Sequence, residues 1–183
     1  EGIDLDLLKE LKENQRARLT EYVKYRKNAK YIPVSDYPKG RNAVWSVPCF
    51  AAFPSATQNE LNLEDAKELI KNGCVCVSEG ANMPSTNEAV DFFVAQKIAY
   101  GPGKAANAGG VATSQLEMAQ NASMVSWTFE EVDAKLEKIM KHIFDTASAT
   151  AKEFGEPTNL VLGANIAGFR RVADAMIEQG IVW

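Results

Sequence analysis

Three short segments of this sequence combine side-chain amides with small residues, a composition suited to holding a polar ligand. They are residues 54–60 (PSATQNE), 79–84 (EGANMP) and 101–110 (GPGKAANAGG). An Asn or Gln side chain both donates and accepts hydrogen bonds, so it can pair with a carboxamide. The segments lack a pair of carboxylates and a nucleophile set beside a base, which disfavours hydrolysis. We therefore expect them to bind a ligand through amides and backbone groups.

Each segment directly follows a stretch with the composition of a strand. We expect strands over residues 44–53, 74–78 and 98–100, separated by a helix over residues 63–71 and another after Pro84. Short apolar strands that alternate with helices form a parallel sheet covered on both faces. Ligands bind outside the carboxyl ends of such strands, so the three segments should meet at one edge. The alternative is that each is an ordinary turn, where Gly, Asn and Pro are also common.

Helices are expected on both sides of this alternating region. Leucines at helical spacing predict one amphipathic helix over residues 4–27, and a loop rich in turn-forming residues follows over residues 31–40. Beyond the third segment, helices are predicted over about residues 112–126, 128–154 and 159–178.

Side chains that satisfy unpaired backbone donors mark several helix starts. Asn62 is the expected N-cap of the helix over residues 63–71, and capping boxes are expected at Ser85 with Glu88 and at Thr128 with Glu131.

Glycines within the last predicted helix indicate close packing against a neighbouring element. Gly163 and Gly168 each cost about 1 kcal/mol relative to Ala in a helix, so a packing reason is expected, and Gly180 should end this helix. Helical spacing also predicts that six apolar side chains are largely buried in the intact assembly. They are Leu116, Met118, Ala119, Ile166, Phe169 and Val172.

The charge balance and hydropathy limit the classes of partner. Twenty Lys and Arg against 24 Asp and Glu give a net charge of −4, which disfavours nucleic acid bound by electrostatics. We interpret the basic run over residues 22–30 as a solvated helix end. No stretch approaches the roughly 20 apolar residues of a membrane span, and no signal peptide is visible. A soluble, cytoplasmic protein is expected.

The cysteines and the single histidine do not indicate a metal site. Cys49, Cys74 and Cys76 lack the spacing of a structural zinc site, and we interpret them as buried strand thiols in a reducing compartment. His142 lies near Lys141 and Asp145, which indicates a solvated helix face.

Several runs of residues closely resemble the hexameric glutamate dehydrogenases, in that family's order. They are ATQNEL (56–61), EGANMPS (79–85), GPGKAANAGGVATS (101–114), LEMAQNA (116–122), GANIAGF (163–169) and ADAMIEQGI (173–181). The resemblance extends from about Val44 to Trp183. Neither the dinucleotide fingerprint G-x-G-x-x-G nor the Walker A sequence occurs in the 183 residues.

The resemblance implies an α/β fold that is only part of a larger enzyme. Residues 1–110 would form the later part of a Rossmann-like parallel-sheet cofactor domain, and residues 111–183 a C-terminal helical segment packing back toward a substrate domain. The family's catalytic lysine and aspartate and its glycine fingerprint would lie upstream of Glu1. The resemblance thus implies no catalytic residue in these 183 residues, which alone should be inactive.

Four residues are implied to bind the cofactor. Asn82 and Asn107 would hydrogen-bond its nicotinamide portion, or the substrate beside it, while Ala56 and Thr57 would line the nicotinamide ribose through backbone groups. The glycines at positions 109–110 would allow close approach.

Two residues are implied to bind the substrate. Val111 and Ser114 match the glutamate pocket, where the serine hydroxyl holds the side-chain carboxylate. Phe50 and Ser55 depart from the family, many of whose members carry an Asp and a Cys there, and this leaves the fine tuning near the strand open.

The implied reaction is the reversible oxidative deamination of L-glutamate to 2-oxoglutarate and ammonia. The cofactor would be NADP, with NAD also possible, and the enzyme a homohexamer. A branched-chain or aromatic amino-acid dehydrogenase of the same fold is a second hypothesis, which Ser114 disfavours because those relatives carry an apolar residue there. A third hypothesis is a non-catalytic fragment that serves assembly or binding.

Overall fold

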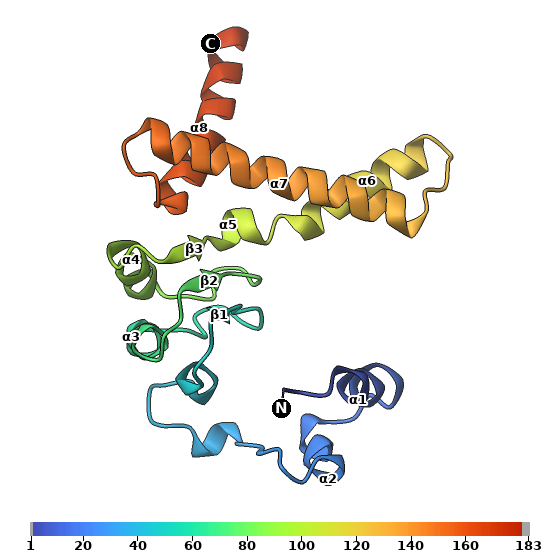
Figure 1. Ribbon diagram of the computed structural model, residues 1–183. Coiled ribbons are helices and arrows are strands. Elements are labelled where there is room, and N and C mark those ends of the chain that lie inside the picture. Colours follow the sequence, from blue (N-terminus) through green and yellow to red (C-terminus); the bar gives the residue numbers. More distant parts are fainter. Residues whose placement is uncertain (1, 181–183) are drawn as a thin grey trace. The chain divides into compact units, whose positions relative to one another are not determined.

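The computed structural model describes residues 2–180 and contains a three-stranded parallel sheet in the order β1-β2-β3 (Figure 1). The strands are β1 (Ala51–Ala52), β2 (Cys76–Ser78) and β3 (Ala99–Gly101), connected by helices α3 (Leu63–Lys71) and α4 (Asn87–Ala95). The predicted α/β fold with parallel strands is confirmed.

The chain divides into two compact units, Glu1–Ala43 and Val44–Trp183. The sheet and the C-terminal helices both belong to the second unit. The predicted division after residue 110 falls inside that unit, and its two domains stay a prediction.

The first unit contains short helices, so the prediction of one helix over residues 4–27 is wrong. Its elements are α1 (Leu5–Lys9), the π-helix η1 (Glu10–Asn14), the 3-10 helix η2 (Leu19–Glu21), α2 (Tyr22–Tyr25) and the 3-10 helix η3 (Val34–Asp36). Arg16, with a φ of 51°, is in the left-handed conformation, which an α-helix does not include. Between Leu11 and Leu19 the only apolar side chain is Ala17, so no apolar stripe stabilises a helix there.

Strand β1 is much shorter than predicted. The 3-10 helix η4 (Ala43–Ser46) occupies the start of the predicted strand, and Pro48 has no N–H to donate to a strand ladder. Val47 and Phe50, within the predicted strand, are exposed. Strands β2 and β3 begin two residues and one residue later than predicted, at Cys76 and Ala99.

Two of the three predicted helix starts with side-chain caps are confirmed. The Asn62 carboxamide oxygen accepts from the Asp65 N–H at 3.1 Å, and Thr128 Oγ1 accepts from the Glu131 N–H at 3.2 Å. The predicted capping box at Ser85 is wrong. Ser85 forms an isolated parallel bridge with Leu61, and α4 begins only at Asn87.

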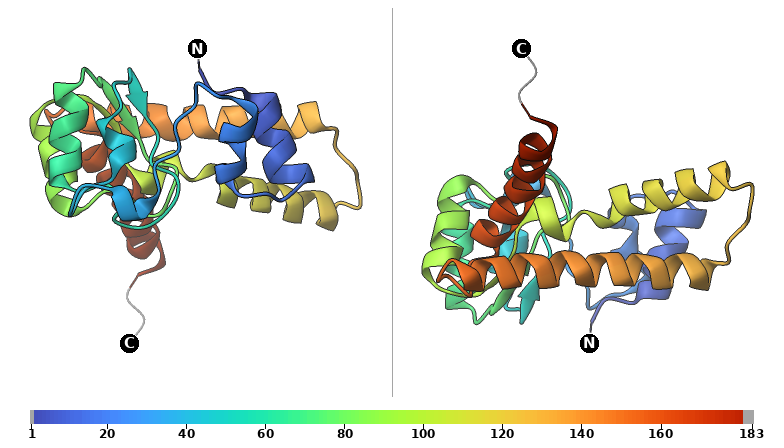
Figure 2. Two further views of the ribbon diagram at one scale, coloured as in Figure 1. Left: turned by 90° about the horizontal axis from the view of Figure 1, so that it is seen from below. Right: turned by 90° about the horizontal axis from the view of Figure 1, so that it is seen from above.

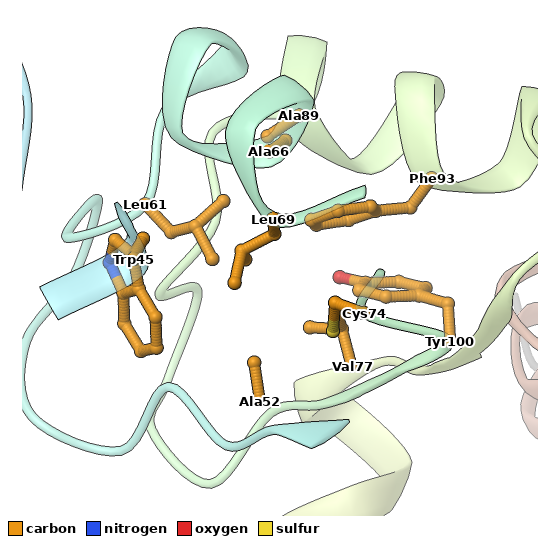
Figure 3. Packing of buried hydrophobic residues seen from close by; sticks show 10 residues of the cluster. All are labelled: Trp45, Ala52, Leu61, Ala66, Leu69, Cys74, Val77, Ala89, Phe93 and Tyr100. Atoms are coloured by element: carbon orange, nitrogen blue, oxygen red, sulfur yellow. The ribbon is translucent and has the colours of Figure 1, made fainter. Parts of the chain in front are cut away.

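The core lies between the sheet and helices α3 and α4 (Figure 3). Ala52, Val77 and Tyr100 occupy matching positions on the three strands and are all buried. Since alternate strand residues face the same side, these three form one row beneath the helices. Phe93 of α4 stacks on Tyr100, with the ring centroids 5.5 Å apart.

Four helices follow the sheet, namely α5 (Gly103–Ala106), α6 (Gly109–Ala122), α7 (Phe129–Glu153) and α8 (Leu160–Gln179). The three long helices confirm the prediction, whereas α5 was not predicted. Helices α6 and α7 form an antiparallel pair, and α8 packs across α7 (Figure 2). An apolar cavity of about 300 Å³ lies between the other face of the sheet and these helices, lined by Ser78, Met140 and Phe144 among others.

Gly163 marks the closest packing of α7 against α8. A Cβ at this position would lie 2.0 Å from the Ala147 carbonyl oxygen, whereas a Cβ at Gly168 would meet nothing within 4 Å. The predicted packing reason is confirmed for Gly163 and is wrong for Gly168 within this chain. Gly180 ends α8 with a φ of 73°.

The six apolar side chains expected to be buried are not all covered by this chain. Leu116 and Ile166 are half-buried, whereas Met118, Phe169 and Val172 are exposed, as is Ala119. Their burial in an intact assembly stays a prediction.

We predict opposite effects for alanine at the two helical glycines. Gly163→Ala should lower the free energy of unfolding of the 183-residue chain by about 1 to 3 kcal/mol, because its methyl group overpacks the helix crossing. Gly168→Ala should raise it by up to about 1 kcal/mol through helix propensity. Urea unfolding of both variants measures this, and equal changes would contradict the packing described.

Candidate functional site

The three amide-rich segments meet at the carboxyl edge of the sheet, as predicted. The Pro54 carbonyl accepts hydrogen bonds from the N–H groups of Gly80 at 2.9 Å and Ala81 at 3.2 Å, and the Asn59 N–H donates to the Met83 carbonyl at 3.0 Å. The first and second segments are therefore held together by backbone hydrogen bonds.

A pair of side-chain amides joins the second segment to the third. Asn107 Nδ2 donates to Asn82 Oδ1 at 2.7 Å and to the Ala81 carbonyl at 3.1 Å. Within residues 2–180, Asn82 Nδ2 and Asn107 Oδ1 make no further hydrogen bond. One donor and one acceptor remain, which is the set that a carboxamide group needs.

Two glycines permit this approach of the loops. A Cβ on Gly103 would lie 2.9 Å from the Ala81 carbonyl oxygen, and one on Gly80 would lie 2.3 Å from Ser55 Oγ. The predicted close approach at Gly109 and Gly110 concerns a ligand and stays a prediction, since no heavy atom of the described chain would lie within 4 Å of a Cβ at Gly110.

Glu79 is a buried carboxylate beside the site whose role the sequence analysis missed. It is 5% exposed and lies directly after β2. Its Oε2 accepts from the Gly103 N–H at 2.7 Å. Its position at the end of an apolar strand could have indicated a functional contact, because an acidic residue is rarely buried without a partner. Burial and the neighbouring Glu79 raise the pKa of the Tyr100 phenol well above its usual value, so Tyr100 stays protonated.

The two residues expected beside the cofactor ribose, Ala56 and Thr57, are exposed on the first segment. The Ala56 N–H donates to Glu60 Oε1 at 2.8 Å. A ligand that uses this N–H must displace the Glu60 carboxylate. Ser55 Oγ donates to the Phe53 carbonyl at 3.0 Å, so its hydroxyl is engaged locally.

Val111 and Ser114 lie one turn apart on the first half of α6, shortly after Asn107, and both are exposed. Residues three apart share one face of a helix. Ser114 Oγ donates to the Gly110 carbonyl at 3.2 Å. Its neighbour Thr113 makes the equivalent bond to Gly109 at 2.9 Å.

The described residues were also compared with the requirements of a metal site and of a membrane-spanning helix. Within residues 2–180 no group of three or more His, Cys, Asp and Glu side chains is arranged to hold a metal ion, and no helix is both long and apolar enough to cross a membrane. His142 is exposed, as predicted.

The cysteines are free, but they are not all buried strand residues. Cys74 is buried and precedes β2, Cys49 precedes β1, and only Cys76 lies in a strand. Burial, together with the neighbouring Cys74, raises the pKa of Cys49 and of Cys76. These two thiols are therefore protonated at neutral pH and poor nucleophiles.

Comparisons with known proteins agree on one family. The family model described as "Glutamate/Leucine/Phenylalanine/Valine dehydrogenase" matches residues 1–180. The NADP-specific glutamate dehydrogenase of Helicobacter pylori (strain J99) is 66% identical over 99% of this chain and 40% of its own length. The glutamate dehydrogenase of Bacteroides thetaiotaomicron is 52% identical over 100% of this chain and 40% of its own length.

A solved structure shows the same relation. The Plasmodium falciparum glutamate dehydrogenase superposes with a TM-score of 0.87 at 49% identity, covering 97% of this chain and 37% of that chain. The chain thus spans about two fifths of the length of the relatives that it matches.

Proposed function

The chain belongs to the glutamate, leucine, phenylalanine and valine dehydrogenase family, and from this premise we propose that the whole protein is an NADP-dependent glutamate dehydrogenase. It converts L-glutamate reversibly to 2-oxoglutarate and ammonia. This chain supplies the later part of the cofactor domain and the C-terminal helices. The family's catalytic lysine and aspartate belong to the rest of the protein, and the chain alone is inactive.

The observation that carries the proposal is the amide pair at the carboxyl edge of the sheet. When bound, the cofactor supplies the hydride acceptor. Asn82 Nδ2 and Asn107 Oδ1 bind its carboxamide. The side-chain amide of Asn107 is oriented by the 3.1 Å hydrogen bond from its Nδ2 to the Ala81 carbonyl. The residues present therefore fit a nicotinamide. Ala56 and Thr57 line the adjoining ribose once Glu60 has released the Ala56 N–H.

Ser114 and Val111 supply the part of the substrate pocket that this chain contributes. Turning the Ser114 hydroxyl toward a carboxylate costs only its bond to the Gly110 carbonyl, and a charge-assisted bond replaces it. An apolar amino acid would offer that hydroxyl no partner. Ser114 therefore favours glutamate over branched-chain and aromatic amino acids.

We also propose a homohexamer in the cytoplasm. Helix α8 carries large exposed apolar side chains, among them Phe169, Met176 and Ile177. Contiguous apolar surface is usually covered in an assembly, so the complete protein buries this helix. NADP is preferred over NAD because the similar Helicobacter pylori enzyme is named NADP-specific.

A steady-state assay of the full-length protein with glutamate, leucine and phenylalanine, each against NADP and NAD, tests the proposal. The highest kcat/KM is expected for glutamate with NADP. A preference for leucine or phenylalanine would favour the second hypothesis. Absence of oxidoreduction with all three would favour a non-catalytic role in assembly or binding.

We predict that Asn107→Ala in the full-length enzyme lowers turnover more than stability. Loss of an orienting amide is felt mainly in rate, and a drop in kcat of about tenfold or more corresponds to ~1.4 kcal/mol. Asn121→Ala, at an exposed position near the end of α6, is the matched control and should keep its turnover. Normal kinetics in the folded fraction of Asn107→Ala would sink the assignment.

We predict that Ser114→Val lowers kcat/KM for glutamate by roughly 10- to 150-fold, because losing a charge-assisted hydrogen bond costs on the order of 1.5 to 3 kcal/mol. Norleucine should lose much less, so the glutamate-to-norleucine ratio falls. Thr113→Val removes a similarly exposed and back-bonded hydroxyl on a different side of α6 and should change neither value. An unchanged ratio in Ser114→Val would show that Ser114 is only a helix residue.

A further inference from the structure

Burying the carboxylate of Glu79 costs free energy of folding. Its Oε1 is buried without a hydrogen-bond partner among residues 2–180, and so is the hydroxyl oxygen of the buried Ser85. Taking a carboxylate out of water costs several kcal/mol unless its lone pairs are satisfied. The hydrogen bond that this carboxylate does make is at Oε2.

Oε2 of Glu79 holds the first residue of α5. It accepts the Gly103 N–H at 2.7 Å, a charge-assisted bond of the stronger kind. Gly103 also has no room for a Cβ, which would lie 2.9 Å from the Ala81 carbonyl oxygen and 3.1 Å from Glu79 Oε2. Gly103 is thus fixed between the Glu79 carboxylate and the Ala81 carbonyl.

The fixed Gly103 determines where Asn107 lies. Helix α5 is only four residues long, and its C-cap is Asn107. The Gly103 carbonyl accepts from the Asn107 N–H at 2.9 Å. One short helical turn therefore transmits the position of Gly103 to the Asn107 backbone, from which the side chain reaches Asn82 and Ala81.

We propose that Glu79 is a positioning residue for the nicotinamide, acting through Gly103 and α5 on the Asn107 amide. This inference rests on the proposed function. The reach of its acceptor oxygen matters more than its charge. An acid kept for its charge would show the reverse dependence, and an acid kept only for its packing would lose thermal stability in Glu79→Asp together with activity.

Two variants of the full-length enzyme separate reach from charge. Glu79→Gln keeps the length and an acceptor oxygen but loses the charge. Glu79→Asp keeps the charge but is one methylene shorter, so it cannot span the 2.7 Å contact. Glu88→Asp, an exposed acid in the first turn of α4, is the matched control.

We expect Glu79→Asp to lose about tenfold or more in kcat for glutamate oxidation, or ~1.4 kcal/mol, while Glu79→Gln stays within about threefold of the wild type. Adenosine 2′,5′-bisphosphate carries the adenine end of the cofactor without the nicotinamide, and its Kd should be unchanged in both variants. Gly103→Ala disturbs the same contact, because its Cβ would lie 3.1 Å from Glu79 Oε2, and it should reproduce the loss in kcat with the same unchanged Kd.

Other results would overturn the inference. Wild-type kcat in Glu79→Asp and Gly103→Ala, or a larger loss in Glu79→Gln than in Glu79→Asp, would show that Glu79 does not act by reach. A parallel loss of bisphosphate binding and thermal stability would show a purely structural acid. If the wild type itself does not oxidise glutamate, the proposed function fails. The role of Glu79 is then tested by the Kd of NADPH, measured from the quenching of protein fluorescence. This Kd should rise in Glu79→Asp and Gly103→Ala and stay near the wild-type value in Glu79→Gln.

Discussion

The candidate site depends on the close approach of two backbone segments, residues 79–82 and 101–107, at the carboxyl edge of the sheet. The Ala81 carbonyl oxygen lies only 2.9 Å from where a Cβ of Gly103 would be, and the same oxygen accepts a hydrogen bond from Asn107. A larger residue at position 103 would separate the segments and part the amide pair. The chemistry of the site thus rests on a steric condition as much as on its polar side chains.

The sheet makes this approach possible. Ser78 pairs with Gly101 at the ends of β2 and β3, so the two segments leave the sheet side by side. The register of the three strands is stabilised by the buried row of Ala52, Val77 and Tyr100, and Phe93 stacks on Tyr100. A slip of one residue would turn that row away from helices α3 and α4. Core packing therefore determines which loop residues meet.

The sequence predicted those features whose physical cause is local. The cap at Asn62 and the capping box at Thr128 are satisfied within three residues, and both predictions were correct. It failed where distant contacts decide the outcome. Ser85 pairs with Leu61 across the sheet edge instead of capping α4, and the contact between Glu79 and Gly103 spans 24 residues. Neither pairing can be read from spacing.

We propose that the amide pair binds the nicotinamide end of the cofactor or the substrate beside it. A crystal structure of the full-length protein with NADP and 2-oxoglutarate tests this most directly. We expect the nicotinamide carboxamide or the bound 2-oxoglutarate to lie within roughly 2.7 to 3.2 Å of Asn82 Nδ2 or Asn107 Oδ1. A complex in which both ligands are held elsewhere, and the two amides contact neither, would contradict it.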